Sequence, residues 1–177
     1  MGVNIREERE EDRDAIAAVV AAAFGSQREA ALVDAIRASD NFVPALSLVA
    51  EVEGEVVAHV MLSYATLHDG DASRRILTLS PLAVAPDYQR RGIGGALVRS
   101  AVAGADERGE PLVVLEGSPA YYGRFGFEHS VGRGITIHLP SWAPPEAAQV
   151  IVLEAYDPSI GGHVVYPPAF DAVTEET

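Results

Sequence analysis

The fold is decided by the stretch Pro81-Leu82-Ala83-Val84-Ala85-Pro86-Asp87-Tyr88-Gln89-Arg90-Arg91-Gly92-Ile93-Gly94-Gly95-Ala96-Leu97. Its first apolar residues continue a strand that begins at Arg75, and residues 85–88 form a short turn. Gly92 then opens a long helical pattern, on which Ile93, Leu97 and Ala101 share one face. A strand that leads through a tight turn into a helix is a building unit of α/β domains.

The start of this predicted helix is suited to binding phosphate groups. The first N–H groups of a helix lack intrahelical partners, and the macrodipole adds roughly half a positive charge there. Gly92, Gly94 and Gly95 have no Cβ atom, so a diphosphate can approach the backbone closely. Arg90 and Arg91 add cationic hydrogen-bond donors beside it.

The glycines at the start of this helix have three other interpretations. A dinucleotide-binding fingerprint would need a further glycine where Leu97 stands. A P-loop would need a lysine, but all 13 basic residues of this chain are arginines. Packing of a helix on a sheet through small residues is the simplest explanation for an isolated Gly-x-Gly.

A second block of sequence favours a functional interpretation of the glycines over simple packing. The wholly apolar segment Leu112-Val113-Val114-Leu115 predicts a strand buried on both faces, and Ala120-Tyr121-Tyr122-Gly123-Arg124-Phe125-Gly126-Phe127 follows it. Residues 89–94 resemble the Gln/Arg-x-x-Gly-x-Gly/Ala signature of the GNAT superfamily of N-acetyltransferases, and residues 120–127 resemble its Tyr-x-x-Phe-Gly-Phe block. The two blocks stand in the family's order, and the sharp match covers residues 75–128.

The resemblance implies an α/β fold with a mixed, mostly antiparallel sheet of six to seven strands. Helices would cover both faces, and the central strands would splay apart. Residues 46–52 and 55–62 predict a hairpin around Glu53-Gly54. With no internal repeat and no linker, we expect a single domain over residues 1–170 and a frayed C-terminal tail over residues 171–177.

The resemblance also implies a site for acetyl-CoA, with no metal. The backbone of Leu82, Ala83 and Val84 would pair with the pantetheine arm of the cofactor. The pyrophosphate would be held by residues of the loop and helix start: Gln89, Arg90, Arg91, Gly92, Ile93, Gly94 and Gly95. Tyr122 falls on the position of the family's general acid, which protonates the leaving thiolate, while Tyr121 and Phe125 are expected to pack.

The general base is less well defined. Many members of the family use a glutamate, but Thr78 and Ser80 occupy the strand where it could stand. Glu116, at the end of the next strand, is the best remaining candidate, although solvated surface carboxylates outnumber catalytic ones.

The resemblance implies transfer of an acetyl or short acyl group to an amine of a small molecule or peptide, by direct attack on acetyl-CoA. The acceptor amine and the length of the acyl group stay open. A non-catalytic acyl-CoA-binding sensor on the same fold is the alternative, and a nucleotide-binding regulator is a third hypothesis.

Composition limits the partners and the compartment. The net charge of −13 disfavours nucleic acid and anionic lipid, and no apolar run approaches the ~20 residues of a membrane span. The absence of cysteine excludes disulfides and thiolate catalysis. These features are compatible with a cytoplasmic enzyme, and the family is compatible with a homodimer formed through the late strands.

For four other features of the sequence we expect a structural role. We expect His59 to be a hydrogen-bonded structural histidine rather than a base. Trp142 is expected to be a packed anchor of the proline-rich loop 140–145. The acidic run 7–12 is expected to be a solvated connection, and Arg37 to lie on the outer face of its helix.

Overall fold

The computed structural model describes residues 2–174, which divide into two compact units. The first unit contains residues 2–63 and 79–104, and the second contains residues 64–78 and 105–174. The strands are β1 (Val3–Glu7), β2 (Phe42–Val52), β3 (Glu55–Asp69), β4 (Ala72–Val84), β5 (Leu112–Glu116), β6 (Glu128–His129), β7 (Ile135–Thr136), β8 (Ala148–Val152) and β9 (Gly162–Val165). The helices are α1 (Arg13–Phe24), α2 (Arg28–Arg37), α3 (Ile93–Glu107), α4 (Pro119–Tyr122) and α5 (Asp171–Thr174). β3 and β4 run through both units.

The first unit is built on antiparallel pairing of β1 with β2 and of β2 with β3. The hairpin between β2 and β3 turns at Glu53 and Gly54, whose φ angles are 53° and 83°. Positive φ at both central residues is the geometry of a two-residue turn that matches the twist of the strands. The hairpin predicted from the sequence is confirmed.

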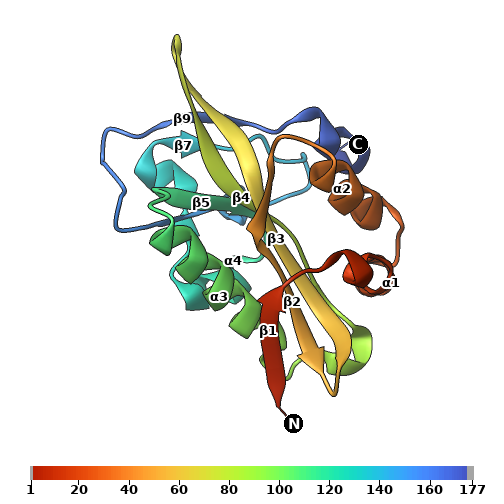
Figure 1. Ribbon diagram of the computed structural model, residues 1–177. Coiled ribbons are helices and arrows are strands. Elements are labelled where there is room, and N and C mark those ends of the chain that lie inside the picture. Colours follow the sequence, from red (N-terminus) through yellow and green to blue (C-terminus); the bar gives the residue numbers. More distant parts are fainter. Residues whose placement is uncertain (1, 175–177) are drawn as a thin grey trace. The chain divides into compact units, whose positions relative to one another are not determined.

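Helices cover both faces of these strands (Figure 1). On one side α1 and α2 pack on each other, and Arg37 of α2 forms an ion pair with Glu8 at the end of β1. On the other side lies α3: a Cβ atom placed on its Gly104 would lie 2.9 Å from Cδ2 of Leu46 in β2. Because both faces are covered, β2 is buried continuously over residues 46–50.

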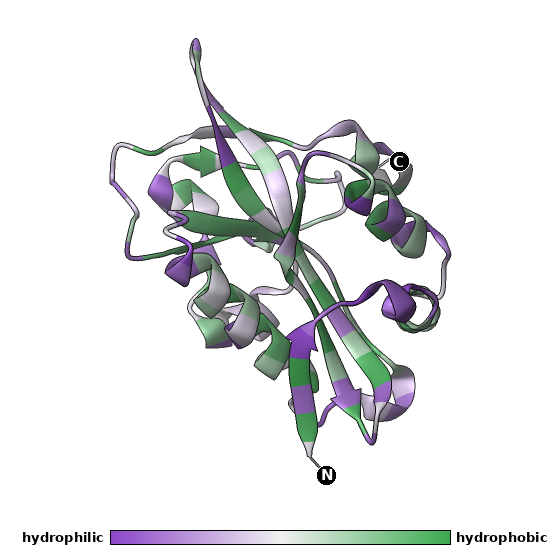
Figure 2. Ribbon diagram, in the orientation of Figure 1, coloured by the Kyte–Doolittle hydropathy of each residue, from purple (hydrophilic) through white to green (hydrophobic). Residues whose placement is uncertain are grey.

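The second unit is organised around β5, which is apolar and buried over residues 112–115 and is mainly green in Figure 2. β5 pairs parallel with β4 at Leu77–Val113 and Thr78–Val114, and antiparallel with β8 along its whole length. β6 pairs with β8, while β9 pairs antiparallel with β3 and parallel with β7. The sheet is therefore mixed and mostly antiparallel, as predicted.

The structure extends the sequence prediction in two places. Nine strands occur in the described residues, and the seven that exceed two residues match the predicted six to seven. Gly70 and Asp71 form the tight turn between β3 and β4, so both strands are longer than expected. Of the predicted tail, α5 covers Asp171–Thr174, and residues 175–177 lie outside the described part of the chain.

Trp142 contradicts its expected role. The side chain is 79% exposed, so it is not a packed anchor of its loop. Residues 140–143 form a turn closed by a hydrogen bond of 3.0 Å from the N–H of Ala143 to the carbonyl of Pro140, and the indole projects from that turn into solvent. Among the described residues, no helix has both the length and the apolar composition that crossing a membrane requires.

Candidate active site

The predicted cofactor loop lies in the first unit, between the end of β4 and the start of α3. A short 3-10 turn over Pro86–Tyr88 leads into it. The side-chain amide of Gln89 donates a hydrogen bond of 3.0 Å to the carbonyl of Val84, which ties the loop to the strand. Arg90 and Gly92 both adopt positive φ, at 63° and 81°. Backbone bends of this kind turn successive N–H groups toward one point and form concave anion sites.

The first turn of α3 supplies further donors. The N–H of Ala96 makes its hydrogen bond to the carbonyl of Gly92 at 3.0 Å. The N–H groups of Ile93, Gly94 and Gly95 precede it, in the first turn, where a helix offers no carbonyl partner. Gly94 and Gly95 are buried, whereas Arg90 and Arg91 are exposed. This arrangement can hold an anion on backbone donors with two exposed arginines at its rim.

The three strand residues of the predicted pantetheine site lie at the end of β4. Ala83 is buried, and Leu82 and Val84 are half-buried. The N–H of Ala85, directly after the strand, donates to the carbonyl of Val57 at 2.9 Å. The position of this strand end is therefore set by β3, within the same unit.

Tyr122 lies in the second unit, at the end of α4. Ser118 caps this short helix by accepting a hydrogen bond from the N–H of Tyr121, and proline follows at its first position. The ring of Tyr122 makes edge-to-face contacts with Tyr121 and Phe127, at centroid distances of 4.9 and 5.8 Å. Tyr121 also packs edge-to-face on Phe125, so the packing predicted for these two residues is confirmed.

The environment of Tyr122 affects its acidity. Burial of the phenol, and secondarily the neighbouring Tyr121, raise the pKa of Tyr122 well above its usual value near 10. The hydroxyl consequently stays protonated throughout the neutral and moderately alkaline range. It can act as a proton donor but not as a base in the free protein.

Glu116 ends β5 and is followed by Gly117, whose backbone is held on both sides. The N–H of Gly117 donates to the carbonyl of Ala147 at 2.9 Å, and its own carbonyl accepts from the buried amide of Gln149 at 2.9 Å. A Cβ atom on Gly117 would lie 2.5 Å from Cε2 of Tyr122. The ring of Tyr122 therefore packs against the residue that directly follows Glu116, within the second unit.

The carboxyl group of Glu116 is perturbed by its surroundings. Desolvation raises the pKa of Glu116, while a hydrogen bond from Tyr166 and the charge of His138 oppose that rise. A carboxylate with a raised pKa accepts protons closer to neutral pH, which is the property of a general base. Glu116 itself keeps access to solvent at the end of the strand.

Tyr166 is the residue that the sequence analysis missed. Its hydroxyl is hydrogen-bonded to both Glu116 and Thr78. Nothing near Tyr166 in the sequence marks it, because its partners lie about 50 and about 90 positions earlier in the chain. Only the pairing of β4 with β5 and the return of the chain after β9 bring the three side chains together.

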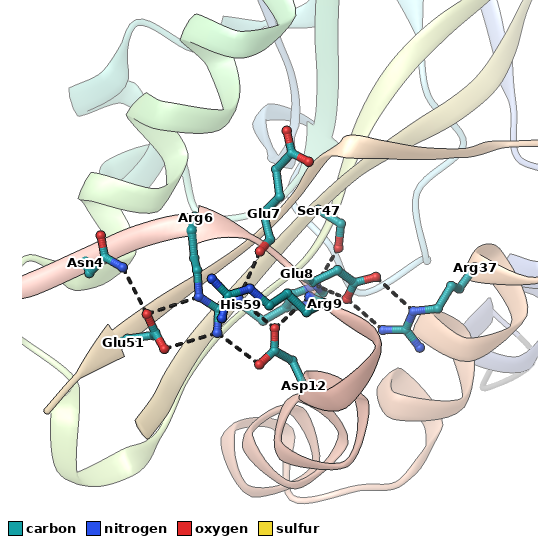
Figure 3. Close-up of polar contacts among 10 residues, drawn as sticks. All are labelled: Asn4, Arg6, Glu7, Glu8, Arg9, Asp12, Arg37, Ser47, Glu51 and His59. Atoms are coloured by element: carbon teal, nitrogen blue, oxygen red, sulfur yellow. Dashed lines mark hydrogen bonds and ion pairs between the residues drawn. The ribbon is translucent and has the colours of Figure 1, made fainter. Parts of the chain in front are cut away.

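His59 is not part of this site. It is fully buried in the first unit, and its Nε2 lies 2.9 Å from Oγ of Ser47 (Figure 3). The hydrogen bond predicted for it is confirmed. Burial lowers the pKa of His59 to about 4; Glu8, with Oε2 3.8 Å from Nε2, opposes the change and Arg37 adds to it.

Two expectations about charged residues near His59 are wrong. Arg37 does not face outward: its side chain is 6% exposed and pairs with Glu8 through two hydrogen bonds of 2.9 Å. The acidic run is not simply solvated, because Asp12 is buried and accepts two hydrogen bonds from Arg6 (Figure 3). In both cases an arginine compensates the cost of burying the carboxylate, from 29 positions away for Glu8 and from six positions away for Asp12.

Within residues 2–174, no group of three or more His, Asp or Glu side chains is placed to hold a metal ion.

Comparison with known proteins agrees with this architecture. Residues 4–130 match the family described as the acetyltransferase (GNAT) domain. The chain is 38% identical over 121 residues to the uncharacterized N-acetyltransferase YjhQ of Escherichia coli strain K12. The matched region spans 68% of this chain and 67% of YjhQ. It is 34% identical over 136 residues to the uncharacterized N-acetyltransferase YhbS of the same strain, spanning 77% of this chain and 80% of YhbS.

Solved structures show the same relationship. The crystal structure of the Escherichia coli GNAT family N-acetyltransferase YhbS in complex with CoA has a TM-score of 0.84 and 30% identity, covering 96% of this chain and 92% of YhbS. A GNAT family acetyltransferase from Brucella melitensis in complex with acetyl-CoA has a TM-score of 0.76 and 32% identity, covering 96% of this chain and 99% of that protein. The resemblance predicted from residues 89–94 and 120–127 is confirmed, and the chain belongs to the GNAT family of N-acetyltransferases.

Proposed function

We propose that this protein transfers an acetyl or other short acyl group from acetyl-CoA to an amine of a small molecule or peptide. The observation that carries the proposal is the structural similarity of this protein, over 96% of the chain, to two acetyltransferases whose structures contain CoA or acetyl-CoA. The loop from Gln89 to Gly95 supports it, because its positive-φ residues and helix start suit a pyrophosphate.

In this proposal the first unit binds the cofactor. The N–H groups of the loop and of the first turn of α3 hold the pyrophosphate, and Arg90 and Arg91 neutralise its charge. Gln89 acts indirectly, since its amide is engaged with Val84 and fixes the shape of the loop. The backbone of Leu82, Ala83 and Val84 pairs with the pantetheine arm as with an added strand.

The chemical step is direct attack. The neutral amine attacks the thioester carbonyl, a tetrahedral oxyanion forms, and a backbone N–H near Leu82 stabilises it. Collapse breaks the C–S bond and releases the thiolate of CoA, to which Tyr122 donates its phenolic proton. A phenol of ordinary acidity, with a pKa near 10, is matched to an alkyl thiolate, whose conjugate acid has a pKa of about 9. Burial keeps Tyr122 protonated at working pH but also makes it a weaker acid, so its pKa has to fall toward 10 when the thiolate develops.

The amine must first lose a proton, because amines are mostly protonated near neutral pH. Glu116 is the proposed acceptor of that proton. Its raised pKa and its place beside Gly117, on which the ring of Tyr122 packs, support this role. The acid and the base would then both belong to the second unit, at the ends of α4 and β5.

The deciding experiment is a turnover screen with acetyl-CoA, in which release of free thiol is measured across amine classes. Polyamines, aminoglycosides, amino acids, peptide N-termini and protein lysines should each be offered. Amine-dependent thiol release supports the proposal. Calorimetric binding of CoA, with no turnover on any class, would favour the alternative of an acyl-CoA sensor. Binding of ATP or NAD in preference to CoA would contradict both.

Three further expectations accompany the proposal. We expect the enzyme to act in the cytoplasm and to have no nucleic-acid or membrane partner, in keeping with its charge of −13. A homodimer is compatible with the family. Sedimentation analysis of the purified chain at several concentrations tests the oligomeric state directly.

A further inference from the structure

The phenol of Tyr166 is held in place by the hydrophobic core of the second unit. Tyr166 follows β9, and its ring stacks on Phe170 at a centroid distance of 5.0 Å and an interplanar angle of 28°. Phe170 is buried, and Tyr166 also packs against the apolar cluster that includes Val114 and Val150. A ring fixed in this way presents its hydroxyl in one direction.

That direction is set by the two neighbouring strands. Thr78 stands opposite Val114 in the parallel pair of β4 and β5, so their side chains share a face. Glu116 lies two residues after Val114 and projects from the same face. The hydroxyl of Tyr166 meets both of these polar side chains.

The direction of the two hydrogen bonds follows from the number of protons. A phenol has one proton to donate, and an ionised carboxylate can only accept. Tyr166 therefore donates to Glu116 and accepts from the hydroxyl of Thr78, which is 1% exposed. The result is an ordered relay from Thr78 through Tyr166 to the carboxylate.

Among the groups around Glu116, the hydroxyl of Tyr166 is a principal influence on the protonation of the Glu116 carboxyl group. Burial favours the neutral acid, whereas the Tyr166 hydrogen bond and a protonated His138 favour the carboxylate. Thr78 contributes no charge, and the backbone at Gly117 is engaged with Ala147 and Gln149. Loss of the Tyr166 hydroxyl would leave desolvation less opposed.

We propose that Tyr166 is a positioning residue, which orients the carboxylate of Glu116 and keeps it ionised so that it can take a proton from the acceptor amine. This inference rests on the proposed function. In the step, R–NH3⁺ gives one proton to Glu116, and the nitrogen lone pair then forms the C–N bond. The C–S bond breaks, Tyr122 protonates the thiolate, and the tyrosinate regains a proton from the nitrogen. In total one proton passes from the carboxyl group of Glu116 to solvent, which balances the reaction.

The test is Tyr166→Phe, which keeps the ring and its stacking and deletes only the hydroxyl. Without that donor the carboxylate is less stable, so the acid limb of kcat/KM should move to higher pH by about one unit. Well below the limb of both enzymes the rate should therefore fall roughly tenfold, and above it the rates should be equal, with little change in the KM for acetyl-CoA. Thr78→Val should shift the limb in the same direction by less. Glu116→Gln should remove this limb.

Tyr156→Phe is the matched control, because Tyr156 packs against the same apolar cluster but makes its polar contact with Arg133. Its acid limb should equal that of the parent. Melting temperatures of all variants separate loss of folding from loss of positioning. A merely structural role for Tyr166 would lower stability without moving the limb, and that result overturns the inference.

A second readout does not depend on activity. The carboxyl carbon of Glu116 can be titrated by ¹³C NMR in the parent and in Tyr166→Phe. A higher pKa of Glu116 in the variant supports the inference, and an unchanged one contradicts it. If the limb and the NMR pKa stay fixed while Glu116→Gln still abolishes the limb, the inference fails and the proposed function stands. If the parent shows no acyl transfer at all, the proposed function fails and the catalytic role of Tyr166 fails with it.

Discussion

The ring of Tyr122 lies directly against the backbone of Gly117: a Cβ atom built on that glycine would lie 2.5 Å from Cε2 and 2.9 Å from Cδ2 of the ring. A glycine is therefore required at position 117 for steric reasons rather than for its backbone flexibility. Because Gly117 is also fixed by hydrogen bonds to Ala147 and Gln149, the ring has to move if a methyl group is added.

Gly117→Ala should consequently displace the phenol of Tyr122. We expect kcat to fall about tenfold or more, since small misplacements of a reacting group are costly, and stability to fall by about 1–3 kcal/mol from overpacking. Gly123→Ala is the matched control, because its Cβ would meet nothing within 4 Å and its φ of −57° suits alanine. Steady-state kinetics and thermal unfolding measure both effects. Equal kcat in the two variants would show that the contact has no role in activity.

Tyr122→Phe tests the proposed acid. The ring contacts with Tyr121 and Phe127 persist, but the proton donor is lost, so kcat should fall about 10²- to 10⁴-fold. The KM for acetyl-CoA should change little, because the proposed cofactor contacts are made by backbone groups elsewhere. Tyr121→Phe should have a much smaller effect. A Tyr122→Phe enzyme with nearly full kcat, with chemistry rate-limiting, would exclude Tyr122 as the acid.

The raised pKa of Tyr122 also predicts the alkaline side of the pH profile. The active form of a general acid is the protonated one, and burial keeps this phenol protonated above pH 10. Activity should therefore not decline below pH 10 through ionisation of Tyr122. Ultraviolet titration of tyrosinate in the parent and in Tyr122→Phe measures the ionisation directly. A tyrosinate signal near pH 9 that Tyr122→Phe removes would contradict the prediction.

The cofactor loop can be tested at Gly92, where a Cβ atom would meet nothing within 4 Å although φ is +81°. Gly92→Ala and Gly92→Trp share the cost of placing an L-residue at positive φ, about 1 kcal/mol or more. Only the tryptophan adds bulk where the pyrophosphate is proposed to bind. CoA should bind at least tenfold more weakly to Gly92→Trp than to Gly92→Ala in calorimetry. The same affinity for both would place the pyrophosphate elsewhere.

His59 predicts how stability depends on acid. Its pKa is about 4 in the folded state against 6.5 when unfolded, so the unfolded state takes up a proton first as the pH falls. The stabilising contribution is present above pH 6.5 and is lost progressively toward pH 4. Between pH 7 and pH 5 the loss should be about 2 kcal/mol, with pKa differences converted at 1.36 kcal/mol per unit.

His59→Gln should reduce this loss, because glutamine can still bond to Ser47 but does not titrate. Urea unfolding at pH 7 and pH 5 measures it. His129→Gln, an exposed histidine in β6, is the control and should keep the parent's pH dependence. If His59→Gln loses as much stability as the parent, the acid sensitivity arises from other groups.

Local features of the chain were predictable from the sequence. The turn at Glu53-Gly54, the loop from Gln89 to Gly95, and the strand 112–115 each depend on neighbouring residues and on the backbone they allow. The family and the mixed sheet followed from two such local blocks in their right order. Glu116 and Tyr122 could be named for the same reason, since each stands beside a recognisable local pattern.

Relations between distant residues could be decided only by the tertiary structure. The burial of Arg37 depends on Glu8, 29 positions away, and the exposure of Trp142 depends on the absence of a partner that no local pattern reveals. The link from Thr78 through Tyr166 to Glu116 exists because β4 and β5 pair in a particular register and the chain returns beside them after β9. Pairing register and burial are properties of the packed sheet. They set which polar groups lose water and find partners, and the sequence of any one segment does not contain that information.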